Sequence, residues 1–379
     1  MKILIAPDKF KGSLAADEVA QALRDGWLSA RPEDEVDCLP LSDGGEGFAR
    51  ICRPFDAEEK RVRVTGPVGR AVEADYFQSG HTVFLETATA CGLSLVPEAM
   101  RNPLRTSTRG VGEILCVLGE RGVLDVFAGL GGSGTNDGGF GMATALGYRF
   151  LDKLGQDLLA HPLELKKLEQ IVAPERRTWP AVTAAADVTN PLLGSKGCTR
   201  TYGFQKGMQE ADVNAFEEAL GCLADTVQRD LGKSAVQMPG AGASGGLGYG
   251  LAVFCDAEVV PGFDLVSNLI GLPQIVAESD LVITGEGSLD SQSLSGKAPV
   301  SLARLAATKG KPVLCVAGRI DSALDWKACF SKIVSTTDCA GSPDASMADP
   351  TRWLQEAARR LGKSSDFPKI VPERSIQTP

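Results

Sequence analysis

Carboxylate side chains stand in glycine, serine or proline contexts directly after several apolar runs of this sequence. They are Asp8, Asp43, Glu46, Asp137, Asp187, Glu286 and Asp290. Ligands of open α/β sheets bind at the carboxyl ends of the strands, so we expect these acidic side chains to form one site. Carboxylates at such a site can hold Mg²⁺, and one of them can accept a proton from a reacting hydroxyl. The pattern therefore favours metal-assisted phosphoryl transfer.

A glycine-rich stretch contributes the second part of this chemistry. Seven of the thirteen residues from Gly129 to Gly141 are glycine. Glycine adopts positive φ readily and lets a backbone approach a ligand closely, which predicts a loop that binds phosphate or substrate. A purely structural turn is the alternative. The candidate contacts in this loop are Gly131, Gly132, Ser133, Asn136 and Asp137.

The same stretch also matches a dinucleotide pattern. Gly129, Gly131 and Gly134 have the spacing of that fingerprint, and Asp152 follows at about the expected distance of ~20 residues. A nicotinamide-dependent dehydrogenase is therefore an alternative function. Against it, the loop continues to Gly139 where the fingerprint expects a helix. The sequence contains no P-loop motif for nucleoside triphosphates.

Candidate cations and hydroxyls accompany the other turns. Lys11 and Ser13 precede a predicted helix, at a place where backbone N–H groups and the helix dipole attract anions. Further candidate contacts for an anionic substrate and ATP are Arg101, Arg105, Asn190, Lys206 and Lys297. Each cation taken alone is equally consistent with a solvated surface charge.

Composition excludes several classes of protein. The net charge of −9 and the pI near 5.0 argue against a nucleic-acid partner. No apolar run is long enough for a membrane span, and a strand is predicted directly after Met1, without a signal peptide. The ten cysteines include no Cys-x-x-Cys pair. We expect them to be buried, reduced thiols in a cytoplasmic protein that has no membrane partner.

Short β-rich runs alternate with helical periodicity along the chain. The predicted strands are 2–6, 36–41, 82–86, 123–129, 182–186, 281–284, 313–317 and 333–335. Apolar residues three or four positions apart predict helices around 19–27, 111–118 and 213–227. This alternation indicates an α/β architecture with a largely parallel sheet. At 379 residues, about two domains are expected.

Eight ordered segments resemble the bacterial type I glycerate kinase family, over roughly residues 1 to 340. They are Ile5–Leu14, Pro40–Gly47, Arg101–Thr106, Gly131–Gly139, Asp187–Leu192, Gln205–Gly207, Pro239–Gly248 and Ile283–Gln292. The resemblance implies an ATP- and Mg²⁺-dependent kinase that phosphorylates D-glycerate, usually at the 2-hydroxyl to give 2-phosphoglycerate. Phosphorylation at the 3-position and phosphorylation of a related hydroxy acid are the nearest alternatives. A catalytically silent ligand-binding protein is a more distant one.

The resemblance also implies an architecture of two α/β domains. A flavodoxin-like domain would comprise residues 1–64 and 261–379, with a second α/β domain, residues 65–260, inserted into it. The active site would lie in the cleft between the domains. The polar tail from Ser364 to Pro379 is expected to be poorly ordered.

Roles for the candidate residues follow from this combination. We predict that Asp187 is the base that accepts the hydroxyl proton, with Lys11 and Asp43 as further catalytic groups. Asp43 and Asp290 are the predicted metal ligands. The remaining candidates, predicted to bind substrate or phosphate, are Asp8, Ser13, Arg101, Arg105, Gly131, Gly132, Ser133, Asn136, Asp137, Asn190, Lys206, Glu286 and Lys297.

Three positions depart from the family pattern. Gly134 stands where alanine is usual, Ser288 where arginine is common and Phe204 where proline is frequent. None of these departures removes a charged group from the candidate site, so the predicted reaction type is unaffected. Ser288 bears on how ATP or glycerate is held.

Overall fold

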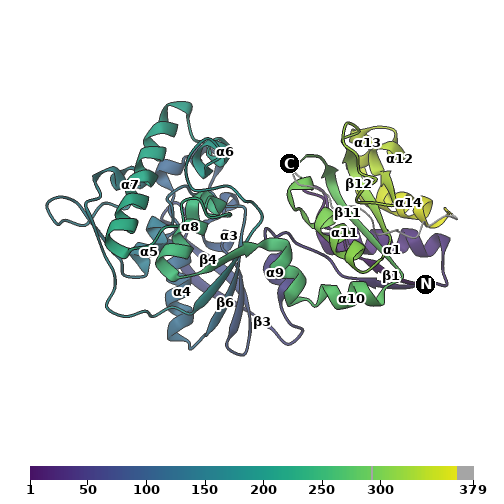
Figure 1. Cartoon of the computed structure of the whole chain (residues 1–379), viewed down its shortest axis with the longest axis horizontal. Helices are drawn as coiled ribbons and strands as arrows, with labels where there is room; N and C mark the ends of the chain where they lie inside the picture. The colour runs from purple at the N-terminus through teal and green to yellow at the C-terminus, as the bar shows by residue number, and fades with distance from the viewer. Residues whose placement is uncertain (292, 365–379) are drawn as a thin grey trace. The chain divides into compact units, whose positions relative to one another are not determined.

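The chain divides into two compact units. The computed structural model describes residues 1–291 and 293–364, whose elements are shown in Figure 1. Unit 1 consists of residues 1–43 and 266–379, and unit 2 of residues 44–265. The first crossing lies earlier than the predicted one near Thr65, because β3 (Glu58–Thr65) pairs with β4 (Ala71–Ser79) in the sheet of unit 2.

Unit 1 contains a five-stranded parallel sheet. Its strands, in spatial order, are β2 (Glu35–Cys38), β1 (Lys2–Ile5), β11 (Leu281–Leu289), β12 (Val313–Ile320) and β13 (Lys332–Ser335). All four neighbouring pairs are parallel. Numbered within the unit, the order is 2-1-3-4-5, the flavodoxin-like arrangement that the family resemblance implied.

Helices from both ends of the chain cover this sheet. They are α1 (Ala16–Ala30), α10 (Leu272–Glu278), α11 (Ala298–Thr308), α12 (Thr336–Ala340), α13 (Pro343–Ala348) and α14 (Pro350–Gly362). Val19, Leu23 and Trp27 of α1 are fully buried, as the helical spacing predicted. At Gly26, a Cβ atom would collide with the carbonyl oxygen of Gln355 in α14. The two helices therefore touch through their backbones at this glycine.

Unit 2 contains a six-stranded mixed sheet. The spatial order is β10 (Glu258–Pro261), β9 (Ala181–Ala186), β6 (Asp125–Leu130), β5 (Thr82–Glu86), β4 and β3. The four strands from β10 to β5 are parallel, whereas β3 and β4 add an antiparallel edge. A separate antiparallel pair is formed by β7 (Arg149–Leu151) and β8 (Gln170–Val172).

Helices pack against the unit 2 sheet around a core of its own. They are α2 (Phe48–Cys52), α3 (Ala88–Cys91), α4 (Arg109–Glu120), α5 (Phe140–Ala145), α6 (Cys198–Tyr202), α7 (Val213–Leu231) and α8 (Ala243–Cys255). The next helix in the sequence, α9 (Gly262–Leu269), contains the second boundary between the units, after Leu265. The apolar core of unit 2 runs from Val62 to Ala257, whereas that of unit 1 uses residues 3–27 and 281–361.

All eight predicted strands are confirmed, and so is the α/β class. The thiols are free, but Cys38 is exposed and Cys116, Cys222 and Cys329 are only half-buried, so the expected burial is wrong for Cys38 and holds only in part for these three residues. Cys38 lies in β2, the edge strand of its sheet, where one side lacks a neighbour. Within the described part of the chain, no helix has both the length and the apolar character needed to cross a membrane. The predicted disordered tail lies, from residue 365 on, outside the described residues.

Candidate functional site

The first group of candidate residues lies at the switch point of the unit 1 sheet, between β1 and β11. Strand order reverses there, and open α/β sheets bind ligands at such a point. Thr284 Oγ1 donates to the Ala6 carbonyl at 2.8 Å, and Asp8 N donates to the Gly285 carbonyl at 2.9 Å. These bonds hold the segments after the two strands side by side. They place Asp8 close to Glu286.

Asp8 and Glu286 are both buried carboxylates, 6% and 5% exposed. Burial, and next the negative charge of Asp43, raise the pKa of Asp8 to about 7. Burial also raises the pKa of Glu286, and the Lys297 ammonium acts in the opposite direction. Glu286 Oε1 is buried and has no hydrogen-bond partner among the described residues. Such a cluster of repelling carboxylates is stabilised by a cation or by a proton.

Lys297 and Asp290 belong to the same part of unit 1. Lys297 Nζ lies 3.5 Å from Glu286 Oε2, at the start of α11. This ammonium is therefore partly neutralised by an internal partner. Asp290 follows β11, and its backbone N–H donates to Ser293 Oγ at 3.2 Å. That bond fixes the turn in which the Asp290 carboxylate stands.

The turn between β1 and α1 carries Lys11 and Ser13. Lys11 is exposed, and Ser13 Oγ is buried without a hydrogen-bond partner in the described residues. Helix α1 begins only at Ala16, and its first turn contains Asp17 and Glu18. These carboxylates already offset the positive end of the helix. An anion at this turn would therefore depend on Lys11 and Ser13 more than on the dipole.

In unit 2, Asp137 is fully engaged inside the glycine loop. Its carboxylate accepts hydrogen bonds from Thr108 N at 2.9 Å and Thr108 Oγ1 at 2.9 and 3.0 Å, and from Gly139 N and Gly141 N at 3.1 and 3.2 Å. The side chain is 1% exposed. Burial raises its pKa, and these hydrogen bonds oppose the shift. Asp137 thus organises the loop backbone, a role that the sequence did not indicate.

Lys206 is a buried cation against the same loop. Its Nζ donates to Ser133 Oγ at 3.1 Å and to the Thr135 carbonyl at 2.7 Å, and the residue is only 3% exposed. Among the described residues, no carboxylate lies within ion-pair distance of it. Burial lowers the pKa of Lys206 to about 8. Gly207, with φ of +89°, lets the following turn pass against the Arg101 carbonyl.

Asp187 and Asn190 follow β9 as predicted, but they differ in exposure and in hydrogen bonding. Asp187 is exposed. Asn190 is used internally, because its Nδ2 donates to the Lys196 carbonyl at 2.7 Å and its Oδ1 accepts from Tyr202 OH at 2.7 Å. Burial and the nearby charge of Asp187 raise the pKa of Tyr202 to about 12. Asn190 therefore shapes the loop that presents Asp187.

The remaining polar candidates of unit 2 surround the glycine loop. Asn136 is buried, with Nδ2 donating to Thr199 Oγ1 at 3.0 Å and Oδ1 unpartnered in the described residues. Arg101 and Arg105 are exposed. Their loop is anchored to the glycine loop by Thr106 Oγ1, which donates to the Gly134 carbonyl at 2.9 Å. The two arginines thus lie on a segment attached to the candidate phosphate loop.

The described residues of the two units contain no preorganised metal site. Within residues 1–291 and 293–364, no group of three or more His, Cys, Asp or Glu side chains has a geometry that could hold a metal ion. Asp43 and Asp290 therefore stay predicted ligands. Mg²⁺ commonly takes only one or two protein carboxylates and completes its shell with phosphate and water, so this finding does not conflict with the prediction.

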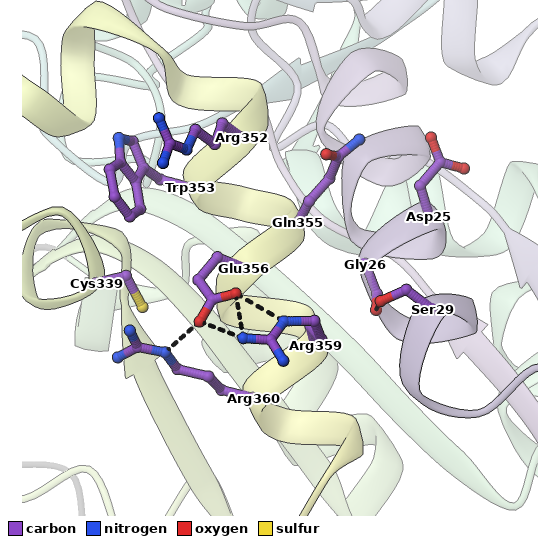
Figure 2. Close-up of a pocket in the computed structure, with 10 residues that line it drawn as sticks. All are labelled: Asp25, Gly26, Ser29, Cys339, Arg352, Trp353, Gln355, Glu356, Arg359 and Arg360. Atoms are coloured by element: carbon purple, nitrogen blue, oxygen red, sulfur yellow. Dashed lines mark hydrogen bonds and ion pairs between the residues drawn. The ribbon is translucent and has the colours of Figure 1, made fainter.

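A surface pocket of about 650 Å³ lies elsewhere in unit 1, between α1, α12 and α14. None of the candidate residues lines it. Figure 2 shows that its most prominent charges are internally paired, since Glu356 binds both Arg359 and Arg360. The Glu356–Arg359 pair has i,i+3 spacing and the Glu356–Arg360 pair has i,i+4 spacing, as is common for ion pairs on the surface of a helix. The pocket lacks the features of the candidate site.

Comparison with known proteins matches almost the whole chain. The profile of the Glycerate kinase family matches residues 3–365. The chain belongs to the glycerate kinase family. A glycerate kinase of Halalkalibacterium halodurans is 39% identical over 97% of this chain and 99% of the relative. A glycerate 2-kinase of Escherichia coli K12 is 39% identical over 84% of this chain and 86% of the relative.

A solved structure agrees with this assignment to the glycerate kinase family. A crystal structure from Salmonella typhimurium LT2, described as that of a candidate glycerate kinase 2, superposes with a TM-score of 0.80. It is 35% identical to this chain and covers 96% of it, and the match covers 97% of the solved chain. The family resemblance that the sequence motifs indicated is thereby confirmed, and so is the α/β fold.

Residues that the motifs did not single out hold the site of this family member in place. Thr108 binds Asp137, Thr106 anchors the arginine loop and Thr199 binds Asn136. Thr106 ends the arginine motif and Thr108 follows it closely in the sequence, but nothing local indicates their partners. The dinucleotide alternative finds no support, because Asp152 instead accepts hydrogen bonds from Leu154 N and Gln156 N in a turn after β7.

Proposed function

We propose that this protein is a cytoplasmic kinase that transfers the γ-phosphoryl group of ATP to the 2-hydroxyl of D-glycerate. The family match over residues 3–365 and the relative named glycerate 2-kinase support this proposal. The structural observation that carries it is the buried Lys206 ammonium on the glycine loop, without a carboxylate at ion-pair distance among the described residues. An enclosed cation of this kind is stabilised by a bound anion.

Asp187 is the proposed base, in preference to Asp137. The buried Asp137 carboxylate already accepts hydrogen bonds from Thr108 and from the backbone of Gly139 and Gly141. Asp187 is exposed at the end of β9, where a substrate hydroxyl can reach it. A carboxylate at hydrogen-bond distance from the attacking hydroxyl can accept its proton or orient it. Arg101 and Arg105 are proposed contacts for the anionic groups of the two substrates.

Mg²⁺ is proposed to bind at the switch point of unit 1. The donor set fits a hard cation, because Asp8 and Glu286 are buried carboxylates, the negative charges of Asp43 and Glu286 raise the pKa of Asp8, and Glu286 Oε1 lacks a described partner. Asp290 lies on the adjoining turn after β11. A bound Mg²⁺ would neutralise charge on the transferred phosphoryl group.

A coupled assay for ADP tests the proposed reaction. ADP formation should require D-glycerate, ATP and Mg²⁺ together, and should stop when Mg²⁺ is chelated. Phosphorus NMR of the product should give the signal of 2-phosphoglycerate. A signal of 3-phosphoglycerate would leave the kinase proposal intact and correct the position. Reduction of a nicotinamide cofactor without ADP formation would instead reject the kinase proposal in favour of a dehydrogenase.

Replacement of the proposed base tests its role. Asp187→Asn should lower kcat by at least ~10²-fold, because the amide cannot accept the hydroxyl proton, while the KM for glycerate changes little. The matched control is Asp125→Asn, an exposed carboxylate at the other end of a neighbouring strand, which should retain full activity. Near-normal turnover of the Asp187→Asn variant would exclude Asp187 as the base.

A further inference from the structure

Ser133 holds an unusual position between a buried cation and the protein surface. Its oxygen accepts a hydrogen bond from Lys206 Nζ at 3.1 Å. The serine proton must therefore be donated elsewhere, and no described residue accepts it. Ser133 is 6% exposed and follows Gly132, which is exposed. A polarised O–H donor thus lies next to an open edge of the glycine loop.

Backbone donors accompany this hydroxyl. The flanking groups are bonded, since Leu93 N donates to the Gly132 carbonyl and Gly134 N to the Cys91 carbonyl, both at 2.8 Å. The N–H groups of Gly132 and Ser133 donate to no residue in the part of the chain that the structure describes. At Gly132, φ is +65°, and the nearest atom to an added Cβ is Ala88 Cβ at 3.7 Å, an ordinary contact distance, so no atom crowds this exposed backbone. Two residues therefore offer three hydrogen-bond donors.

We propose that Lys206 is a positioning residue, which orients the Ser133 hydroxyl so that Ser133 and the amides of Gly132 and Ser133 bind the carboxylate of the hydroxy-acid substrate. This inference rests on the proposed function, and it replaces the expectation that Lys206 itself contacts the anion. Enclosure of Lys206 at 3% exposure leaves Ser133 and Gly132 as the groups that a ligand meets first.

The charge at this place suits a carboxylate better than the ATP phosphates. One ammonium, without an ion-pair partner among the described residues, balances one negative charge. Nucleoside triphosphate carries several negative charges and is commonly bound by more than one cation together with Mg²⁺. Hydrogen-bond donors backed by a buried charge are an effective arrangement for a single oxyanion.

Titration of Lys206 gives this proposal a second observable. Burial lowers the pKa of Lys206 to about 8. The charged or titratable groups that face it are the thiols of Cys198 in α6 and Cys91 in α3 and the carboxylate of Asp137 in the glycine loop, and all three act to raise the pKa. As the pH rises through about 8, the ammonium loses its charge, and glycerate binding should weaken.

A double-mutant cycle tests whether Lys206 acts through Ser133. Ser133→Ala should raise the KM for D-glycerate about tenfold, the effect of removing one hydrogen bond to a charged group, and leave the KM for ATP within about twofold. Lys206→Met should raise the glycerate KM at least as much. In the Lys206→Met background, Ser133→Ala should have no further effect beyond about twofold. Lys60→Met, on the exposed strand β3, is the matched control and should leave both KM values unchanged.

Two outcomes would overturn the inference. If the effects of Ser133→Ala and Lys206→Met on the glycerate KM multiply in the double variant, Lys206 acts independently of Ser133. If the KM for ATP rises instead of the KM for glycerate, the site binds phosphate. Should Lys206→Met fail to fold by circular dichroism, the pH profile decides. The glycerate KM of the unaltered protein should rise above about pH 8, and that of Ser133→Ala should not; a rise in both would reject the inference. Absence of ADP formation by the unaltered protein would reject the proposed function itself.

Discussion

Individual glycines of the 129–141 loop serve different purposes. An added Cβ at Gly129 would meet the Gly44 carbonyl at 2.8 Å, and at Gly139 it would meet Gly250 Cα at 2.8 Å. The same close packing applies to Gly131, Gly134, Gly138 and Gly141. Of the seven glycines, only Gly132 could carry a Cβ atom at ordinary contact distance, 3.7 Å from Ala88 Cβ. The role of this loop in ligand binding therefore stays a prediction, whereas packing explains why glycine is required at most of these positions.

The titration of Lys206 predicts a stability that depends on pH. The pKa of Lys206 is about 8 in the folded protein against 10.5 for an exposed lysine. Between these two pH values the unfolded chain binds more protons than the folded one, so the free energy of unfolding should rise with pH. The unaltered protein should gain roughly 1 to 3 kcal/mol relative to Lys206→Met between pH 8 and about 10.

Urea unfolding at pH 7, 8, 9 and 10 measures this difference. Below pH 8 both states of the unaltered protein hold the proton, and the difference between the proteins should stay constant. Lys60→Met controls for loss of a lysine that is only half-buried, and its difference from the unaltered protein should not vary with pH. A constant difference for Lys206→Met across the whole range would show that Lys206 keeps its ordinary pKa.

At the scale of elements, the sequence predicted buried strands well and exposed ones poorly. The parallel strands carry continuous apolar runs, as Leu281–Ile283 of β11 shows, because both faces of the sheet are covered. Strand β3 carries charges at Glu58–Arg61 and lies at the sheet edge, so its sequence has little apolar signal. Its partner β4 is also largely half-exposed, with only Ala74 and Tyr76 buried. Both strands were therefore absent from the prediction.

The contact between α1 and α14 leads to a second prediction. In Gly26→Ala, the new methyl group would collide with the Gln355 carbonyl, and the free energy of unfolding should fall by about 2 kcal/mol or more. Gly221→Ala in α7 is the matched control, because an added Cβ meets nothing within 4 Å there. Alanine favours a helix over glycine, so this variant should gain about 0.5 to 1 kcal/mol.

Chemical denaturation of the three proteins compares these values. The contrast between two glycines that both lie inside helices separates the effect of backbone contact from helix propensity. An equal stabilisation of both variants would mean that α1 and α14 can move apart without cost, which the close approach at Gly26 argues against.

At the scale of the whole molecule, the two units have separate cores. The main apolar cluster of unit 2 lies within residues 62–257, and that of unit 1 is formed by residues from both chain ends. Unit 2 is therefore a continuous segment that interrupts the sequence of unit 1. Strands β1 and β11 of unit 1 are neighbours in space although unit 2 separates them in sequence.

This arrangement predicts that unit 2 folds by itself. Residues 44–265 expressed alone contain a complete six-stranded sheet and its covering helices, so the segment should give a dispersed proton–nitrogen NMR spectrum and a cooperative thermal transition. Residues 266–364 expressed alone lack β1 and β2 and serve as the comparison; they should not fold cooperatively. A disordered spectrum for residues 44–265 would show that its core depends on unit 1.

The sequence by itself determined the family, the α/β class and the kinds of chemical group available, because these depend on local motifs and on runs of apolar residues. Tertiary structure alone decided what those groups are free to do. Lys206 and Ser133 are 73 residues apart in the sequence, and their contact leaves the Ser133 hydroxyl able to donate to a ligand. Thr108 and Asp137 are 29 residues apart, and their contact uses the Asp137 carboxylate to hold the loop. Burial and hydrogen-bond partners arise only when distant segments meet, so no local pattern could reveal them.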